Sequence, residues 1–412
     1  MNAGLERGTR VPRDTMPLVT LEERTAPSSG PRPVAVWALG FRPFYLVAAV
    51  HAALSIGLWA LQFAGLLPWA YLQGPAWHAH EMLFGFAAAV IVGFLFTAGH
   101  NWTGKPTPTG RRLAALVLLW LAGRVLVLTP WAVAAGVANV AFPLAAAIAL
   151  AVPLVQARNR RNYFFVALLL ALAVAALVFH LAQLGVRPWP AWVGVQVALD
   201  VVLVVVAVMA GRVVPMFTNN GVPGAGATRR PALETLSIAS VVALLAADIV
   251  RLDGAPLAIL AGVGAVAHGA RAALWKPWRT ARVPLVWVLH AAYAWIPLHL
   301  ALRAGAALDL VPSTIAVHAL TVGAIGGLTI GMMTRTALGH TGRPLRAGRA
   351  EVACYGLVVV AALLRVLVPP VAPALTVQAI VASAFAWSAA FGLYAVVYAP
   401  RLVLARADGR PG

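Results

Sequence analysis

The sequence predicts an all-α, polytopic membrane protein with twelve transmembrane helices and both termini in the cytoplasm. Three observations lead to this fold class: 61% of the 412 residues are hydrophobic, only 10% are charged, and apolar runs of spanning length recur along the chain. Soluble domains carry about 25% charged residues, and a run of roughly 18 or more apolar residues can cross a bilayer. The lipid bilayer is therefore the first expected partner.

The chain divides into three parts. Residues 1–40 are rich in Arg, Pro and Thr and have no apolar core of the signal-peptide type, so we expect a disordered cytoplasmic tail. Residues 41–400 form the transmembrane domain, and residues 401–412 form a second cytoplasmic tail. The twelve spans are expected at residues 43–67, 78–98, 112–129, 131–154, 162–185, 191–214, 232–250, 256–275, 283–303, 312–334, 350–368 and 374–399.

The positive charge follows the loops. Of the 31 Lys and Arg residues, 26 lie before the first span, after the last span or in alternate connections between them. This alternation marks cytoplasmic loops, so it accounts for the net charge of +19 without a nucleic-acid partner. The single cysteine, Cys354, excludes an intrachain disulfide and a cysteine-based metal cluster.

One stretch of sequence occurs twice, at an offset of 238 residues without a gap. His80 and Gly85 match His318 and Gly323, and each copy ends in Thr-Gly-(Lys/Arg)-Pro. Both copies run from the outer face to the cytoplasm, so the two histidines lie at equal depth. Neutral imidazole is a common metal ligand and a standard axial ligand of haem iron. We therefore expect a haem b between the two helices, with His80 and His318 as axial ligands.

Other polar side chains near the outer face are candidates for the same site or a second one. Arg303 and Arg365 are expected to contact haem propionates; the alternative is that they snorkel or pair locally. His78 lies two residues before His80, about 200° away on a helix, so the two cannot both face one iron. The expected ligands of a copper ion are His78, His180 and His299. The alternative for each is a hydrogen-bonded packing role.

Three helix ends on the cytoplasmic side look alike. They end the second, sixth and tenth spans, and this spacing of four spans hints at three four-helix units. Their polar side chains suit a structural turn network, a proton entrance or an anion contact; they include Arg212, Arg335, His340 and Arg343. Asp200 and Glu81 are carboxylates within the membrane, which are either paired with a cation or protonated.

Several of these stretches resemble the NnrS family of bacterial inner-membrane proteins. The resemblance is carried by Gly-Phe-Arg-Pro-Phe-Tyr at residues 40–45, Trp-His-Ala-His-Glu-Met-Leu-Phe-Gly at 77–85, Asn-Trp-Thr-Gly at 101–104, and residues 211–221 and 318–343. It implies a haem- and copper-containing protein of the bacterial inner membrane that acts in the nitric oxide stress response or denitrification. Nitric oxide is then the expected small ligand, and whether haem-dependent redox chemistry turns it over stays open.

Two other functions stay open from the sequence. Twelve helices with internal repeats are common among proton-coupled transporters, and a haem protein without turnover would be a sensor or an assembly factor. Haem–copper oxidases also have twelve helices, with haem ligands on the second and tenth. This chain lacks their adjacent His-His pair and their His-Pro-Glu-(Val/Ile)-Tyr signature, so the comparison is an analogy of fold alone.

Overall fold

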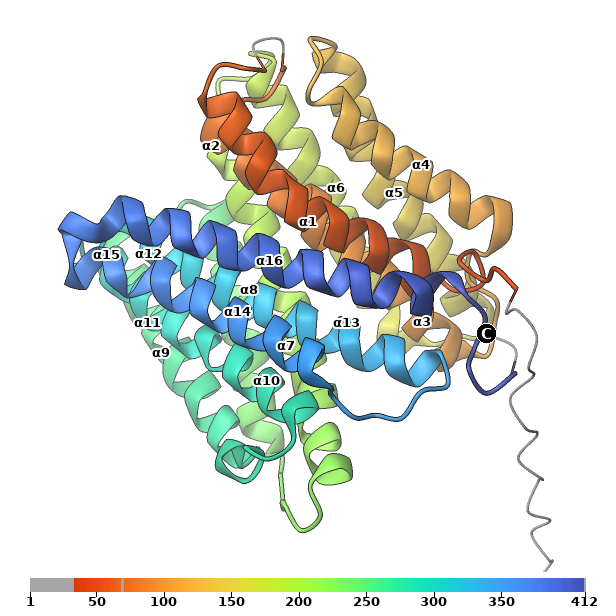
Figure 1. Cartoon of the computed structure of the whole chain (residues 1–412). Coiled ribbons are helices and arrows are strands. Elements are labelled where there is room, and N and C mark those ends of the chain that lie inside the picture. Colours follow the sequence, from red (N-terminus) through yellow and green to blue (C-terminus); the bar gives the residue numbers. More distant parts are fainter. Residues whose placement is uncertain (1–32, 68–69, 411–412) are drawn as a thin grey trace, which may run out of the picture.

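The computed structural model describes residues 33–67 and 70–410, and these are almost entirely helical (Figure 1). Within the described part, extended pairing is limited to one antiparallel bridge between Val34 and Leu404. This confirms the all-α membrane fold. Residues 1–32 of the expected N-terminal tail lie outside the described residues.

The described chain forms twelve helical rods, several of them interrupted. Eleven are long and apolar enough to cross a membrane. The remaining one, α4, has 17 residues, which is about the lower limit for a spanning helix. The rods are α1 (Phe41–Phe63), α2–η1–α3 (Gly74–His80, Glu81–Ala87, Ala88–Thr103), α4 (Gly110–Leu126), α5 (Ala132–Gln156), η2–α6 (Arg160–Asn162, Tyr163–Gln183), α7 (Trp192–Gly221), α8 (Pro231–Ile249), α9–η3 (Gly254–Leu274, Pro277–Arg279), α10–α11 (Pro284–Tyr293, Trp295–Ala306), α12–η4–α13 (Ser313–His318, Ala319–Gly326, Gly327–His340), α14–α15 (Arg349–Val366, Val368–Val371) and η5–α16 (Pro373–Leu375, Thr376–Val403).

The two copies of the repeated sequence have the same irregular backbone. In each copy a short α-helix ends at the repeated histidine, a π-helix follows, and a longer α-helix completes the span. The π-helices are η1 (Glu81–Ala87) and η4 (Ala319–Gly326). A π-helical turn holds one residue more than an α-helical turn, and such wide turns occur frequently at functional sites.

The ninth span is broken beside the second copy. Pro297 has no N–H group to donate to the carbonyl of Tyr293, so α10 ends at Tyr293 and α11 begins at Trp295. The indole of Trp295 fills the space that a side chain at Gly323 would occupy.

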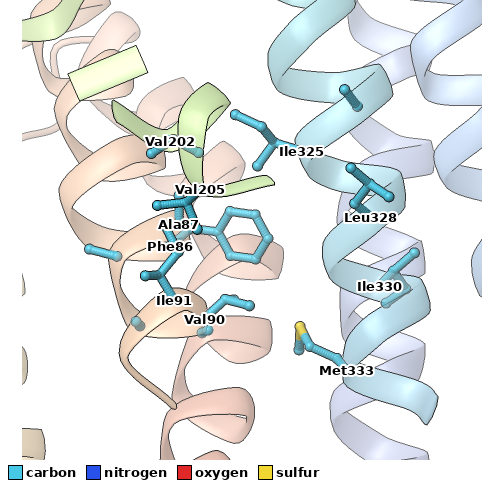
Figure 2. Close-up of a cluster of buried hydrophobic side chains, with 14 of the residues drawn as sticks. Phe86, Ala87, Val90, Ile91, Val202, Val205, Ile325, Leu328, Ile330 and Met333 are labelled. Atoms are coloured by element: carbon cyan, nitrogen blue, oxygen red, sulfur yellow. The ribbon is translucent and has the colours of Figure 1, made fainter. Parts of the chain in front are cut away.

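Three spans lie at the centre of the bundle: η1–α3, α7 and η4–α13. In their most apolar windows, 89%, 67% and 67% of the residues are buried inside the protein, so most of their surface meets other helices and not lipid. They are the second, sixth and tenth spans, the spacing that three four-helix units predict. Figure 2 shows side chains from these spans meeting between the ribbons. We call this group the apolar layer; it contains Val90, Ile91, Val202, Val205, Leu328 and Met333.

The bundle has a basic end, which holds most of the Lys and Arg residues and the C-terminus, and an opposite end that we call the far end. The described residues of both expected tails are ordered at the basic end. α16 continues to Val403, Ala405 donates to the carbonyl of Pro33 at 2.9 Å, and Ala407 donates to that of Thr341 at 2.9 Å. The C-terminal segment is thereby fixed to the end of the second repeat copy.

Candidate functional site

A cavity of about 480 Å³ lies near the far end, between the two repeat copies. Most of its walls are apolar, and its volume falls within the range of small-molecule sites, roughly 300–1,000 Å³. We call it the far cavity. Its lining includes Trp59, His78, Met82, Phe86, His318, Thr321, Ile325, Arg365 and Trp387.

Two histidines line the far cavity, one just before the first copy and one at the start of the second. His78, on α2, stacks on Trp59 with ring centroids 4.8 Å apart, and its Nδ1 atom is buried without a hydrogen-bond partner in the described part of the chain. His318, at the end of α12, donates from Nδ1 to the carbonyl of Thr314 at 2.6 Å. That hydrogen bond leaves Nε2 of a neutral His318 with its lone pair, the state in which imidazole binds metal.

The two arginines expected at haem propionates have different surroundings. Arg365 lines the far cavity, and its side chain makes no hydrogen bond or ion pair with the residues described. Arg303 does not line the cavity. It donates to Asp200 at 3.2 Å and forms a close ion pair with Asp248. Two carboxylates on this side of the protein therefore neutralise Arg303, which corrects the expectation that it contacts a propionate.

The structure does not bring His80 and His318 together. His80 is fully buried outside the far cavity, against Phe179 and His180. Its Nδ1 atom lies 2.7 Å from Glu81 and its Nε2 atom 3.1 Å from Nε2 of His180. Both ring nitrogens of His80 are therefore occupied, and it is His78, not His80, that lines the cavity together with His318.

Glu81 is the centre of a buried charge network, which we define as His51, His80, Glu81, Arg124 and Asn139. Arg124 donates to Glu81 at 2.8 Å and also bonds Asn139, and Nε2 of His51 lies 3.3 Å from the Glu81 carboxylate. Gly85 makes room for this network, because a Cβ atom there would lie 2.5 Å from Arg124 and 2.8 Å from His51.

A hydrogen-bonded chain leads from the far end to Glu81. The hydroxyl of Tyr71 lies 3.3 Å from Nδ1 of His180, and His80 connects His180 to the carboxylate. With both imidazoles neutral, every member donates toward Glu81: Tyr71 to His180, His180 to His80, and His80 to Glu81. Burial raises the pKa of Tyr71, outside the spans, to about 12, so its hydroxyl keeps its proton at neutral pH. The chain can therefore pass a proton inward.

The three histidines expected to bind copper lie in three different places. His78 lines the far cavity, and His180 belongs to the Tyr71 chain. Nδ1 of His299 donates to the carbonyl of Ala316 at 2.8 Å, and its Nε2 is buried without a partner among the described residues. Across the part of the chain that the structure describes, no group of three or more metal-binding side chains gathers.

Asp200 is fully buried and forms a paired site with Asp248. Gln196 donates to both carboxylates at 3.2 Å, and Arg303 bridges them. The second oxygen of Asp200 is buried without a partner in the described chain. Two carboxylates that share one arginine retain a net negative charge unless one of them is protonated.

A second cavity, of about 390 Å³, lies near the basic end, and we call it the basic cavity. The three similar helix ends of α3, α7 and α13 meet there, and Arg335 and His340 contribute to its lining. Arg212 lies beside it, 5.9 Å from the ring of Trp102, and donates to Asn162 at 2.7 Å. Arg343 lies outside the lining and donates to the carbonyl of Thr341.

Sequence reasoning missed two parts of the site. Arg124 was not singled out, although its position within an apolar span was a signal of burial. The facing of His78 toward the far cavity depends on η1, and no residue pattern marked the π-helical turn.

Comparison with known proteins supports one assignment. A family model described as NnrS protein matches residues 35–406. A comparison with curated proteins finds no match. The matched region contains every described span, both repeat copies and both cavities, and the chain therefore belongs to the NnrS family.

Proposed function

We propose that the protein binds haem b in the far cavity, with His78 and His318 as its ligands, and that it acts on nitric oxide in the bacterial inner membrane. The observation that carries the proposal is that His318, which begins the second copy, and His78, two residues before the first copy, line the same apolar cavity. The resemblance to haem proteins of nitric oxide metabolism and denitrification gives the ligand.

The residues of the far cavity fit a haem in three respects. They offer two imidazoles from different spans, apolar surfaces such as Phe86 and Trp387 for a macrocycle, and the unpaired Arg365 for a propionate. The haem would supply an iron centre that binds nitric oxide and exchanges electrons. The apolar walls would exclude water and favour a small uncharged ligand.

The two histidines are held with different strength. The hydrogen bond from His318 to Thr314 fixes its ring and raises its basicity as a ligand. The Nδ1 atom of His78 has no such bond in the described chain, and only the stacking on Trp59 orients it. We propose that His318 is the firmer ligand and that an incoming ligand competes with His78.

Absorption spectra of the purified protein test this proposal. We expect a Soret band that is lost in His318→Ala and weakened or shifted in His78→Ala. His100→Ala is the matched control, because His100 is exposed at the basic end. Unchanged spectra in both cavity variants would overturn the ligand assignment. Nitric oxide added to the reduced protein should shift the band, and steady consumption of nitric oxide would distinguish an enzyme from a sensor or assembly factor.

We also propose that copper binds between His80 and His180, where it would replace the proton that the two Nε2 atoms share. The two Nε2 atoms face each other in the protein interior, and the bonds from Glu81 and Tyr71 to the outer ring nitrogens, which orient both imidazoles, support this assignment. Copper content per protein should fall in His180→Ala and stay unchanged in His299→Ala. Equal copper in the two variants would overturn the assignment.

Proton-coupled transport is a second candidate function. Its supporting observation is that two cavities lie at opposite ends of the three central spans, with the apolar layer between them. Uptake of a substrate into proteoliposomes that depends on a pH gradient would favour this function over haem chemistry.

A further inference from the structure

The basic cavity contains a buried arginine without a counter-charge. Arg335 is 9% exposed and lines the cavity. Its guanidinium lies 3.9 Å from the ring centroid of Phe217, and it forms no hydrogen bond or ion pair with the residues described. An unpaired charge in a protein interior is costly, so a ligand that neutralises Arg335 would gain binding energy.

No described carboxylate is available to neutralise it. The cavity lining contains neither Asp nor Glu. Near the basic end, Glu234 is paired with Arg271 at 2.6 Å and Glu351 with Arg401 at 2.7 Å. Asp408 is likewise paired, with Arg406 at 2.6 Å, so the described residues leave Arg335 without a counter-charge, which a bound anion would supply.

The rest of the lining indicates the chemistry of the ligand. Asn101, Asn220 and Thr336 offer hydrogen-bonding groups, whereas Phe217 and Met332 form an apolar wall. A volume of about 390 Å³ accommodates more than a bare inorganic ion. An anionic group attached to an apolar body would satisfy both parts of the lining.

We propose that the basic cavity binds a small organic carboxylate, which enters from the basic end and places its carboxylate on Arg335. The planar guanidinium matches the two oxygens of a carboxylate in a bidentate pair. The two cavities share no lining residue, and the apolar layer lies between them along the central spans, so this site is separate from the proposed haem site and does not depend on it.

Ligand-induced thermal stabilisation of the purified full-length protein tests this proposal. Benzoate, acetate and neutral benzamide are suitable probes. We expect benzoate to raise the melting temperature at lower concentration than acetate, because it fills the apolar wall, and benzamide to have little effect. No stabilisation by benzoate, or equal stabilisation by benzamide, would overturn the proposal. Equal potency of benzoate and acetate would overturn the assignment to this cavity.

Three variants locate the effect. Arg335→Gln should weaken the benzoate response at least about tenfold, the value of a charged hydrogen bond. Arg346→Gln is the matched control, because it removes an equal charge from an exposed position in the following loop, and its response should equal that of the wild type. An equal loss in both variants would show a nonspecific charge effect and overturn the proposal.

The third variant keeps the proposal testable if Arg335→Gln does not fold. Ala98→Glu introduces a carboxylate into the cavity lining. It should stabilise the protein without added anion and remove the response to benzoate. A full benzoate response in Ala98→Glu would overturn the proposal.

Discussion

The two repeat copies share a backbone and differ in what surrounds it. In the first copy, the space next to Gly85 holds the polar ends of Arg124 and His51; in the second, the space next to Gly323 holds the indole of Trp295. The residue after the repeated histidine is Glu81 in one copy and Ala319 in the other. The same helix thus supports a charge network once and an apolar wall once, so a shared backbone does not assign a shared role to matched histidines.

The largest expected effect comes from removing the charge that defines the first copy. Glu81→Gln leaves Arg124 buried without its counter-charge, which should cost about 3–5 kcal/mol of unfolding free energy. Ala319→Ser, at the matched position of the second copy, should cost less than about 1 kcal/mol. Unfolding in mixed micelles by increasing denaturing detergent measures both. Equal stability of the two variants would show that the network contributes nothing special to the first copy.

Replacing Gly85 and Gly323 by alanine compares how tightly each copy is packed by its neighbours. Gly323→Ala forces a methyl group against a rigid indole, and overpacking of this kind costs about 1–3 kcal/mol. Gly85→Ala meets the ends of flexible side chains, so it should cost less stability but disturb the hydrogen bonds of Arg124. The same unfolding assay compares them. A larger loss in Gly85→Ala would mean that the network is more rigid than the indole packing.

Tyr71 connects only the first copy to the far surface. Tyr71→Phe removes its hydrogen bond to His180 and should cost about 1 kcal/mol at pH 7. Burial raises the pKa of Tyr71 to about 12, whereas the pKa of a tyrosine in the unfolded chain is near 10. The hydroxyl therefore makes its full contribution to the free energy of unfolding below pH 10, and this contribution is lost as the pH rises toward 12. The difference in unfolding free energy between wild type and variant should therefore shrink above pH 10. A difference that stays constant to pH 12 would contradict this.

The smallest effect concerns the ends of the copies. Gly104 is open, whereas the carboxylate of Asp408 covers Gly342. The hydrogen bonds of Arg406 lower the pKa of Asp408 to about 2, whereas the pKa of an aspartate in the unfolded chain is near 4. The pair therefore contributes to the free energy of unfolding above pH 4, and this contribution is lost as the pH falls toward 2. Because the pair is partly exposed, Asp408→Asn should cost no more than about 0.5 kcal/mol at pH 7. Melting temperatures at pH 7 and pH 3 measure it, and a larger loss at pH 3 would contradict the assignment.

The sequence predicted the spans and their direction but not the facing of side chains within the site. Apolar runs and loop arginines are local signals, so the twelve spans and the equal depth of His80 and His318 could be obtained from them. The pairing of Glu81 with Arg124 depends on which helices are neighbours, and hydropathy carries no such information. The orientation of His78 depends on how α2 is rotated about its axis. The π-helix η1 alters that rotation, and no pattern of residues in the sequence predicts a π-helix there.

The π-helices change the helical rotation of two of the three central spans, those that contain η1 and η4. Met82 lines the far cavity and Phe94 lines the basic cavity. On a regular α-helix, residues twelve apart point about 120° away from each other. The wide turn of η1 holds one extra residue, so the rotation between the two side chains is smaller by about 100°, the rotation of one residue. The two side chains therefore lie on nearly the same face. Deleting one residue from η1 would leave a regular α-helix in which the two side chains, now eleven residues apart, still lie on nearly the same face, so the bundle could lose or gain this wide turn during evolution without rotating one cavity's wall against the other.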